Sequence, residues 1–222
     1  MSNRQLTAAD GHVFDVYEAI PDGAIKGGIV VIQEIFGVNL HIREVVDGYA
    51  KDGYAAIAPA LFDRVERGVE LGYDEQKDFD KGLDIAFQKL KIEDALVDIQ
   101  AVAQELDKHG KVGVVGYCFG GLLTWLSACR LNGISACSAY YGGGTVNHIS
   151  ESAKCPVIMH FGEKDEHIPM TEVEKIRSSL RAVDVYVYDA DHGFNCDHRS
   201  SYDQTSAETA KTRTLDFFAS NL

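Results

Sequence analysis

The 222-residue sequence lacks the features that mark membrane, secreted and disulfide-bonded proteins. It contains 4 prolines, and none of its apolar runs is long enough to span a bilayer. The opening stretch, MSNRQLTAADG, has no apolar segment of the kind that directs secretion, so we expect a cytoplasmic protein. Its 5 cysteines are irregularly spaced and form no CxxC pair. This pattern argues against a disulfide framework and against a structural zinc site, and we expect no metal.

The chain is also poor in positive charge. It has 21 Lys and Arg residues against 34 Asp and Glu residues, which gives a formal net charge of -13. Nucleic acids and anionic membrane surfaces would repel such a protein, so we expect neither as a partner. The hydrophobic content of 45% and the charged content of 25% are typical of a soluble globular protein. The length suits one domain over residues 1–222, as a monomer or a small homo-oligomer.

Strand-like and helix-like segments alternate along the chain. Strands are predicted within 28–33, 54–59, 111–117, 134–143, 156–165 and 184–194. Helices are predicted within 39–53, 122–133, 171–183 and 207–222, with a long amphipathic segment over 83–110 and an exposed excursion over 63–82. The alternation predicts an α/β fold, in which helices cover both faces of a mainly parallel sheet.

One turn in this pattern carries a nucleophilic side chain. The stretch GYCFGG, residues 116–121, directly follows the apolar run that begins at Val112. Its glycines allow a turn too sharp for larger side chains, and Cys118 lies at the tip. This is the pattern of a nucleophile elbow, with sulfur where oxygen is usual. Gly-rich turns between a strand and a helix also bind phosphate, so the elbow pattern alone leaves both readings open.

Further polar residues follow other predicted strands, where ligands bind in parallel sheets. Asp165 lies in HFGEKDEHIP and His192 in DADHGF. With Cys118 they occur in the chain order of an α/β-hydrolase triad, nucleophile, acid and histidine. Asp189 and Asp191 are rival acids, but as close sequence neighbours of the histidine they are less able to face its distal nitrogen. Cys118, Asp165 and His192 are therefore the predicted triad.

Six stretches together resemble the dienelactone hydrolase (carboxymethylenebutenolidase) family. They are QEIFGVN at 33–39, GYAAIAPALF at 53–62, KVGVVGYCFGG at 111–121, FGEKDEHIP at 161–169, DADHGF at 189–194 and TRTLDFF at 212–218. The resemblance covers nearly the whole chain. It implies an α/β-hydrolase fold and a hydrolase of small lactones or activated esters that needs no cofactor.

The resemblance also implies roles for four side chains. Cys118 would be the nucleophile that forms a thioester, His192 its base and Asp165 the acid that orients the base. Glu34, in QEIFGVN, would contact the thiol and help to activate it when substrate binds; its alternative role is to cap the following helix. The backbone N–H groups of Phe119 and Ile35 are the expected oxyanion donors.

Substrate recognition departs from the family pattern. Better-known members bind a substrate carboxylate with arginines, one of them a few residues beyond the catalytic histidine and in a histidine–serine context. Here the stretch reads HGFNCDHRSSY, with Gly193 and Cys196 in place of that serine and arginine, and Arg199 displaced. Residues 73–82 offer only Lys77 and Lys81 for the other arginine, so Lys77, Lys81 and Arg199 are the candidate side chains for binding a substrate carboxylate. We therefore expect a weaker preference for carboxylated dienelactones, and acceptance of neutral lactones or short activated esters.

Two other functions stay open at this point. Cys118 could perform acyl transfer or redox chemistry, with Cys196 as its resolving partner, or the chain could be an inactive ligand-binding module. A disulfide between the two cysteines would favour the redox function, and an intact triad argues against the inactive module. The histidine nearest the predicted site, His198, has no assigned role.

Overall fold

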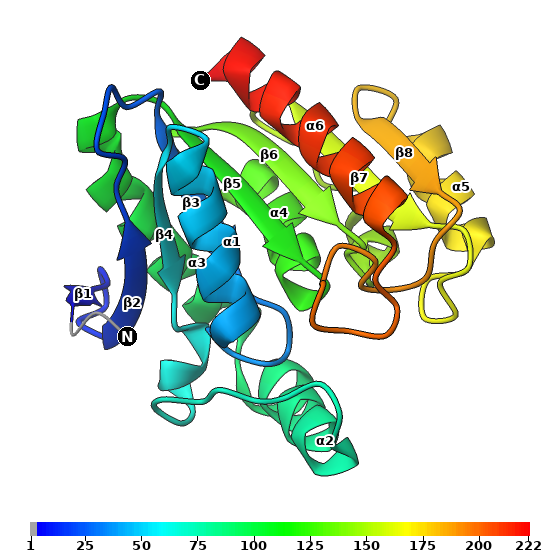
Figure 1. Cartoon of the computed structure of the whole chain (residues 1–222), viewed down its shortest axis with the longest axis horizontal. Helices are drawn as coiled ribbons and strands as arrows, with labels where there is room; N and C mark the ends of the chain where they lie inside the picture. The colour runs from blue at the N-terminus through cyan, green and yellow to red at the C-terminus, as the bar shows by residue number, and fades with distance from the viewer. Residues whose placement is uncertain (1–3) are drawn as a thin grey trace.

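The computed structural model describes residues 4–222, and an eight-stranded sheet forms its centre (Figure 1). The strand order is β1-β2-β4-β3-β5-β6-β7-β8. Strands β1 and β2 join the sheet antiparallel, and every pair from β4 to β8 is parallel. The strands are β1 (Gln5–Thr7), β2 (Val13–Ala19), β3 (Gly28–Ile32), β4 (Ala55–Pro59), β5 (Val112–Tyr117), β6 (Ile134–Tyr140), β7 (Val157–Gly162) and β8 (Asp184–Tyr188).

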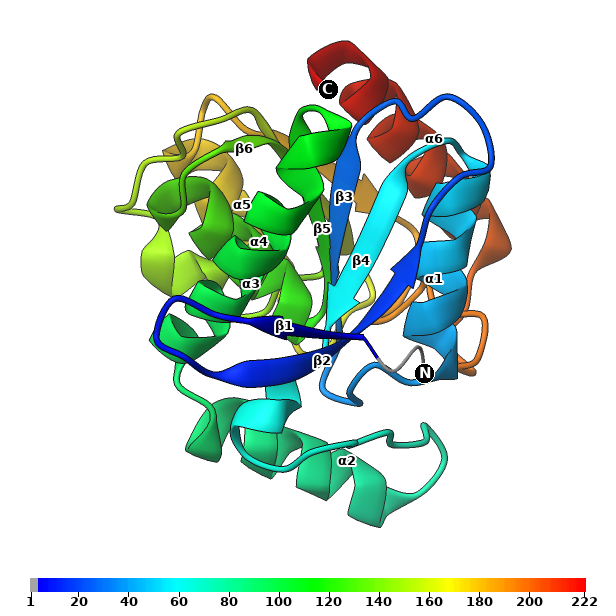
Figure 2. The ribbon, with the colours of Figure 1, turned by 90° about the vertical axis from the view of Figure 1, so that its left-hand side faces the viewer.

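Helices cover both faces of this sheet. Helices α1 and α6 lie on one face, and α3, α4 and α5 lie on the other, while α2 extends below the sheet (Figure 2). The helices are α1 (Leu40–Lys51), α2 (Gln76–Asp84), α3 (Ile92–Leu106), α4 (Phe119–Arg130), α5 (Met170–Ser179) and α6 (Gln204–Asn221). The predicted α/β class, with a mainly parallel sheet between two helical layers, is confirmed. No helix within residues 4–222 has the length and hydrophobicity to cross a membrane.

Two regions differ from the sequence-based prediction. The two antiparallel strands at the N-terminal side of the sheet were not predicted. The amphipathic segment over 83–110 is two helices rather than one: a π-helical turn over Ile85–Lys89 follows α2, and Leu90 is extended before α3 begins. This break lets the chain change direction, so α2 leaves the sheet and α3 packs back onto it.

The parallel strands end at one edge of the sheet and carry the predicted site residues to it. Glu34 follows β3, Cys118 follows β5, Asp165 follows β7 and His192 follows β8. These strands are neighbours or near neighbours in the sheet. Residues far apart in the sequence therefore meet at the carboxyl edge, where α/β sheets bind ligands.

The close approach of α4 to β3 depends on Gly120. A Cβ atom built at this glycine would lie 2.5 Å from the carbonyl oxygens of both Ile32 and Gln33. Both are backbone atoms, which cannot move aside without shifting the strand. A glycine at this position therefore sets how closely the turn at Cys118 sits over the sheet.

Replacing Gly120 by alanine should destabilise the protein by about 1–3 kcal/mol, because the new methyl group overpacks against fixed backbone. The measurement is the free energy of unfolding from urea titration. Gly23→Ala is the matched control, since a Cβ at Gly23 meets nothing within 4 Å and its change should stay within about 0.5 kcal/mol. Equal stability of the two variants would contradict the packing argument.

Candidate active site

Cys118 lies in a strained turn between β5 and α4. Its φ of 55° and ψ of -116° are unusual for a residue with a side chain, and such backbone strain costs about 1–3 kcal/mol. Three hydrogen bonds hold the turn: the Cys118 N–H donates to the carbonyl of Tyr140 at 3.0 Å, and the Cys118 carbonyl accepts from the N–H groups of Gly121 and Leu122 at 2.8 and 3.3 Å. This is the predicted elbow, and it leaves the thiol partly exposed.

The imidazole of His192 lies against Asp165. The distance from Nδ1 of His192 to Oδ2 of Asp165 is 2.7 Å, and both side chains are buried. The other carboxylate oxygen of Asp165 accepts the backbone N–H groups of His167 and Ile168, at 2.8 and 3.1 Å. The carboxylate is thus fixed on one side by the backbone and orients the imidazole with the other.

The two rival acids are engaged elsewhere. Asp189 is exposed and forms an ion pair with Lys164. Asp191 accepts the backbone N–H of His192 at 2.6 Å, so it contacts that residue's main chain rather than its ring. Among the residues that the structure describes, Asp165 is therefore the acid that faces the imidazole.

The surroundings of His192 favour its protonated form. Burial lowers the pKa of the imidazole, but the charge of Cys118 and the hydrogen bond to Asp165 outweigh that effect and raise the pKa to about 10. A cationic imidazole beside the sulfur stabilises a thiolate. The protonated imidazole of His192 therefore places a positive charge next to the Cys118 sulfur.

Glu34 is a buried carboxylate held by two neighbours. Its side chain is 1% exposed. Oε2 accepts the hydroxyl of Tyr73 at 2.9 Å, while Oε1 lies 3.6 Å from Nη1 of Arg199 and accepts no hydrogen bond. The structure pairs Glu34 with an arginine, and its carboxylate does not cap α1, which is capped by Asn39.

Arg199 reaches the site although it is displaced in the sequence. Its guanidinium lies 5.9 Å from the ring centre of Phe36 and 5.8 Å from that of Tyr73, which fixes its plane by cation–π contacts. Gly193, with a φ of +76°, leaves the space that the arginine uses, since a Cβ there would lie 2.5 Å from Nη1. The site therefore contains an arginine although position 196 is a cysteine. The expected weak preference for carboxylates rested on the lack of such an arginine and loses that basis.

A cavity of about 430 Å³ opens above these groups. Cys118, His192 and Arg199 line it, together with Ile35 and Phe119. Most of its wall is apolar, contributed by Phe36, Phe79, Leu83, Phe87, Leu122 and Ile168. A small molecule with one polar end and an apolar body fits such a wall.

The predicted lysines lie outside this cavity. Lys77 forms an ion pair with Glu75 and Lys81 with Glu66, all four on the surface, and neither lysine lines the cavity. The predicted oxyanion residues lie inside it. The backbone N–H groups of Ile35 and Phe119 have no acceptor within residues 4–222, so both are available to a ligand.

Cys196 does not resemble a resolving cysteine. It is fully buried, and burial together with the charge of Glu34 raises its pKa to about 12. A thiol that stays protonated is a poor nucleophile for disulfide exchange. All 5 cysteines are free thiols.

Two tyrosines belong to the site but were not predicted. Tyr73, which donates to Glu34, comes from the segment predicted as an exposed excursion. Tyr141 is fully buried with a φ of 35°, its hydroxyl has no partner, and its ring centre lies 5.1 Å from that of His192. Backbone strain next to a candidate site is a signal that only the folded structure provides.

Comparisons with known proteins identify the family of this chain. The model of the family described as "Dienelactone hydrolase family" matches residues 14–222. The chain belongs to the dienelactone hydrolase family. A carboxymethylenebutenolidase of Pseudomonas putida is 32% identical, and the match covers 96% of this chain and 94% of that protein. The solved structure of a candidate dienelactone hydrolase from Klebsiella pneumoniae has a TM-score of 0.85 at 32% identity and covers 97% of each chain.

A curated relative from a Synechocystis strain, a candidate carboxymethylenebutenolidase, is 37% identical over 87% of this chain and 86% of its own length. Membership of the dienelactone hydrolase family confirms the predicted α/β-hydrolase fold and makes the protein a hydrolase of lactones or carboxylic esters.

The pKa of His192 gives a test of the pairing with Cys118. A folded-state pKa of about 10 lies above the free-histidine value of about 6.5. The group's contribution to stability is therefore complete below about pH 6.5 and is lost as the pH rises through 10. In Cys118→Ala the pKa of His192 should fall, because the charge of Cys118 is the largest of the influences that raise this pKa against the effect of burial. NMR titration of the imidazole nitrogens measures this directly, and an unchanged pKa in the variant would rule out the ion pair.

Proposed function

We propose that this member of the dienelactone hydrolase family cleaves a small lactone or activated ester that carries a carboxylate. Cys118, His192 and Asp165 would act as the catalytic triad. The observation that carries the proposal is the elbow cysteine, which shares one cavity with an imidazole fixed by a buried carboxylate.

The acylation half of the reaction follows from this arrangement. The Cys118 thiolate attacks the carbonyl carbon, and the N–H groups of Ile35 and Phe119 donate hydrogen bonds to the oxyanion of the tetrahedral intermediate. When the intermediate collapses, the C–O bond breaks and the imidazolium of His192 gives its proton to the leaving oxygen. A thioester remains on Cys118; in a lactone, the new hydroxyl stays attached to the acyl chain.

Deacylation uses the same residues in reverse roles. His192, now neutral, accepts a proton from water, and the hydroxide formed attacks the thioester. Asp165 holds the imidazole in the tautomer that exposes Nε2 to the cavity, because Nδ1 is engaged by the carboxylate. The Cys118 thiolate then leaves, and the acid product is released.

Arg199 is the group proposed to recognise the substrate. It lines the cavity, and its planar guanidinium is held for a bidentate contact with a carboxylate. A substrate carboxylate competes with Glu34 for the same cation. As the ion pair at 3.6 Å weakens, the Glu34 carboxylate is released from its counter-charge beside the site. Substrate binding would in this way assist activation of the thiol.

The catalytic roles are tested by substitution. Cys118→Ala should lower ester hydrolysis by about 10⁴-fold or more, and Asp165→Asn by up to about 10⁴-fold, because the imidazole adopts the wrong tautomer. Hydrolysis of a p-nitrophenyl ester is the assay, and circular dichroism checks folding. Asp189→Asn and Asp191→Asn are matched controls that should keep most of the rate. A loss in either control as large as that in Asp165→Asn would refute the choice of acid.

The substrate charge is tested separately. The ratio of kcat/KM for a carboxylated lactone to that for its methyl ester should favour the acid by about 10- to 100-fold, since a charge-assisted hydrogen bond contributes about 1.5–3 kcal/mol. Arg199→Gln should abolish the preference while hydrolysis of the methyl ester changes little in comparison.

Lys77→Gln and Lys81→Gln are the controls for the substrate test, because both lysines lie on the surface outside the cavity. Each should leave the ratio unchanged. A wild-type enzyme that treats acid and ester alike, or a lysine variant that loses the preference, would show that Arg199 does not read the carboxylate.

A further inference from the structure

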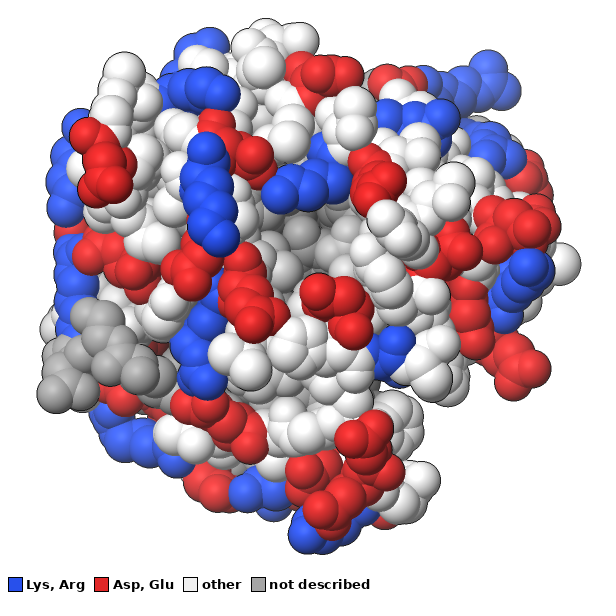
Figure 3. All heavy atoms as spheres, viewed as in Figure 1, with Lys and Arg blue, Asp and Glu red and all other residues white. Residues whose placement is uncertain are grey.

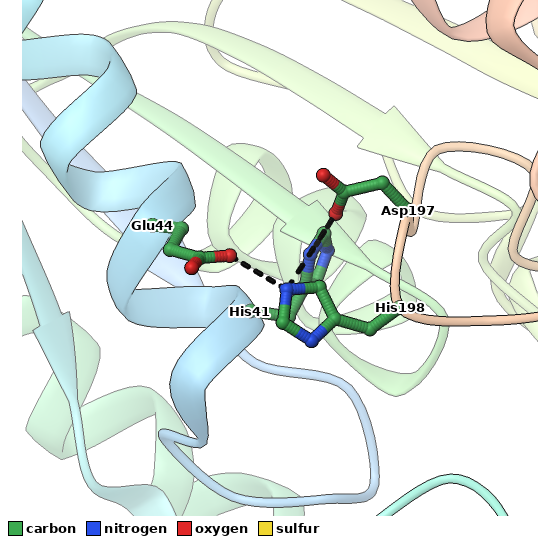
Figure 4. Close-up of side chains that lie close together, drawn as sticks. All are labelled: His41, Glu44, Asp197 and His198. Carbon is green, nitrogen blue, oxygen red and sulfur yellow. Dashed lines mark hydrogen bonds and ion pairs between the residues drawn. The ribbon is translucent and has the colours of Figure 1, made fainter.

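Four potential metal ligands meet outside the catalytic cavity (Figure 4). His41 and Glu44 come from the first turns of α1, and Asp197 and His198 come from the loop between β8 and α6. One ligand atom from each side chain lies within 4.8 Å of the other three. The two segments are 156 residues apart in the sequence, so the fold alone brings this set together.

The spacing of these atoms suits a small ion. Nδ1 of His41 lies 3.2 Å from Oδ1 of Asp197, and Nε2 of His198 lies 3.8 Å from the same oxygen and 2.6 Å from Oε2 of Glu44. A tetrahedral ion with bonds of about 2.0–2.1 Å holds neighbouring ligand atoms about 3.3 Å apart. Small side-chain movements would place all four atoms at that distance.

The supporting structure is well defined. His41 and Glu44 are three residues apart on a helix, so their side chains share one face. Hydrogen bonds from the N–H of Arg199 to the Cys196 carbonyl, and from Asp203 to Phe194, fix the loop around the other two ligands.

Three of the four residues border a cavity that opens to the surface. His41, Glu44 and Asp197 line a cavity of about 220 Å³ that continues between α1 and α6. In the space-filling view, the surface is hollowed between these helices (Figure 3). An ion therefore has a path from solvent to three of the four ligand residues.

A second observation concerns the far side of the His41 ring. Its Nε2 is buried and has no hydrogen-bond partner, and Oε1 of Glu34 is in the same state. His41, Glu34 and Cys196 each offer one atom within 4.8 Å of the others. Because Nδ1 faces Asp197, Nε2 is the nitrogen left to face the buried carboxylate. A metal-bound histidine commonly directs its second N–H to a carboxylate, and Glu34 is the carboxylate that His41 could reach here, although no hydrogen bond joins the two side chains in this structure.

We propose that His41, Glu44, Asp197 and His198 form a binding site for a divalent transition-metal ion of the Zn²⁺ class. Two imidazole nitrogens and two carboxylate oxygens are a ligand set that suits Zn²⁺ and its spectroscopic substitute Co²⁺. Bound metal would link α1 to the loop that carries His192 and Arg199, and it would fix the proton of His41 on Nε2. The sequence-based expectation of no metal rested on the lack of a CxxC pair, which does not bear on a site of this type.

Cobalt binding is the direct test. Purified metal-free protein is titrated with Co²⁺ under reducing conditions, and the visible absorption of tetrahedral cobalt is recorded. Because Cys118 and His192 could also bind metal, the titration is repeated in Cys118→Ala. We expect one equivalent in that variant, displaced by Zn²⁺, with no thiolate-to-metal charge-transfer band. Absence of saturable binding in Cys118→Ala would overturn the proposal.

Variants locate the ion. His198→Gln and Asp197→Asn, both at the surface, should each weaken Co²⁺ binding at least about tenfold and remove the rise in thermal unfolding temperature caused by Zn²⁺. His12→Gln is the matched control, because His12 also lies beside a carboxylate, 4.0 Å from Asp98, and should bind like wild type. Unchanged affinity in the first two variants would overturn the proposal. A charge-transfer band that disappears in Cys196→Ser would also overturn it, because the metal would then be bound by the buried cluster of Glu34, His41 and Cys196.

Discussion

The carboxylate of Glu34 is removed from water at the centre of the site, and the surrounding residues are arranged around that charge. Burying an ion costs several kcal/mol unless partners compensate it. Tyr73 supplies a hydrogen bond and Arg199 a counter-charge, yet Oε1 is left without a hydrogen bond. The compensation is therefore incomplete, and the carboxylate remains sensitive to any ligand that draws Arg199 away or to a proton placed on the nearby His41.

On the other side of the cavity, backbone strain and close packing fix the position of the Cys118 thiol. The backbone of Cys118 adopts a conformation that costs free energy, and Gly120 lets α4 pack directly on the carbonyls that end β3. This places the sulfur and the loop of Glu34 at one edge of the sheet. Packing of α4 on β3 therefore stabilises the strained elbow and fixes the position of the thiol. His192 and Asp165 lie on loops on the far side of the cavity.

The sequence predicted those features that depend on local pattern or chain order. The strands over 28–33 and 111–117 are continuous apolar runs, and the elbow at Cys118 is a local turn, so each could be recognised without tertiary contacts. The position of Tyr73 could not be predicted, and Arg199 was one of three candidate cations that the sequence could not rank, because the places of both residues result from packing between segments distant in the chain. The break at Leu90 was missed for a related reason: amphipathic spacing continues across it, and only the packing of α3 on the sheet requires the chain to turn there.

Arg199 places a guanidinium in the cavity from a sequence position three residues beyond the one that the family pattern indicates. Counting residues from His192 leads to Cys196, and the expected arginine is then absent. In the folded chain the arginine three residues later enters the cavity instead, because Gly193 has no side chain to oppose it and Phe36 and Tyr73 flank its guanidinium. A serine at position 193 and an arginine at position 199 would need the same space. The two positions are thus coupled by steric exclusion in this structure, a relation that becomes visible only in the folded loop.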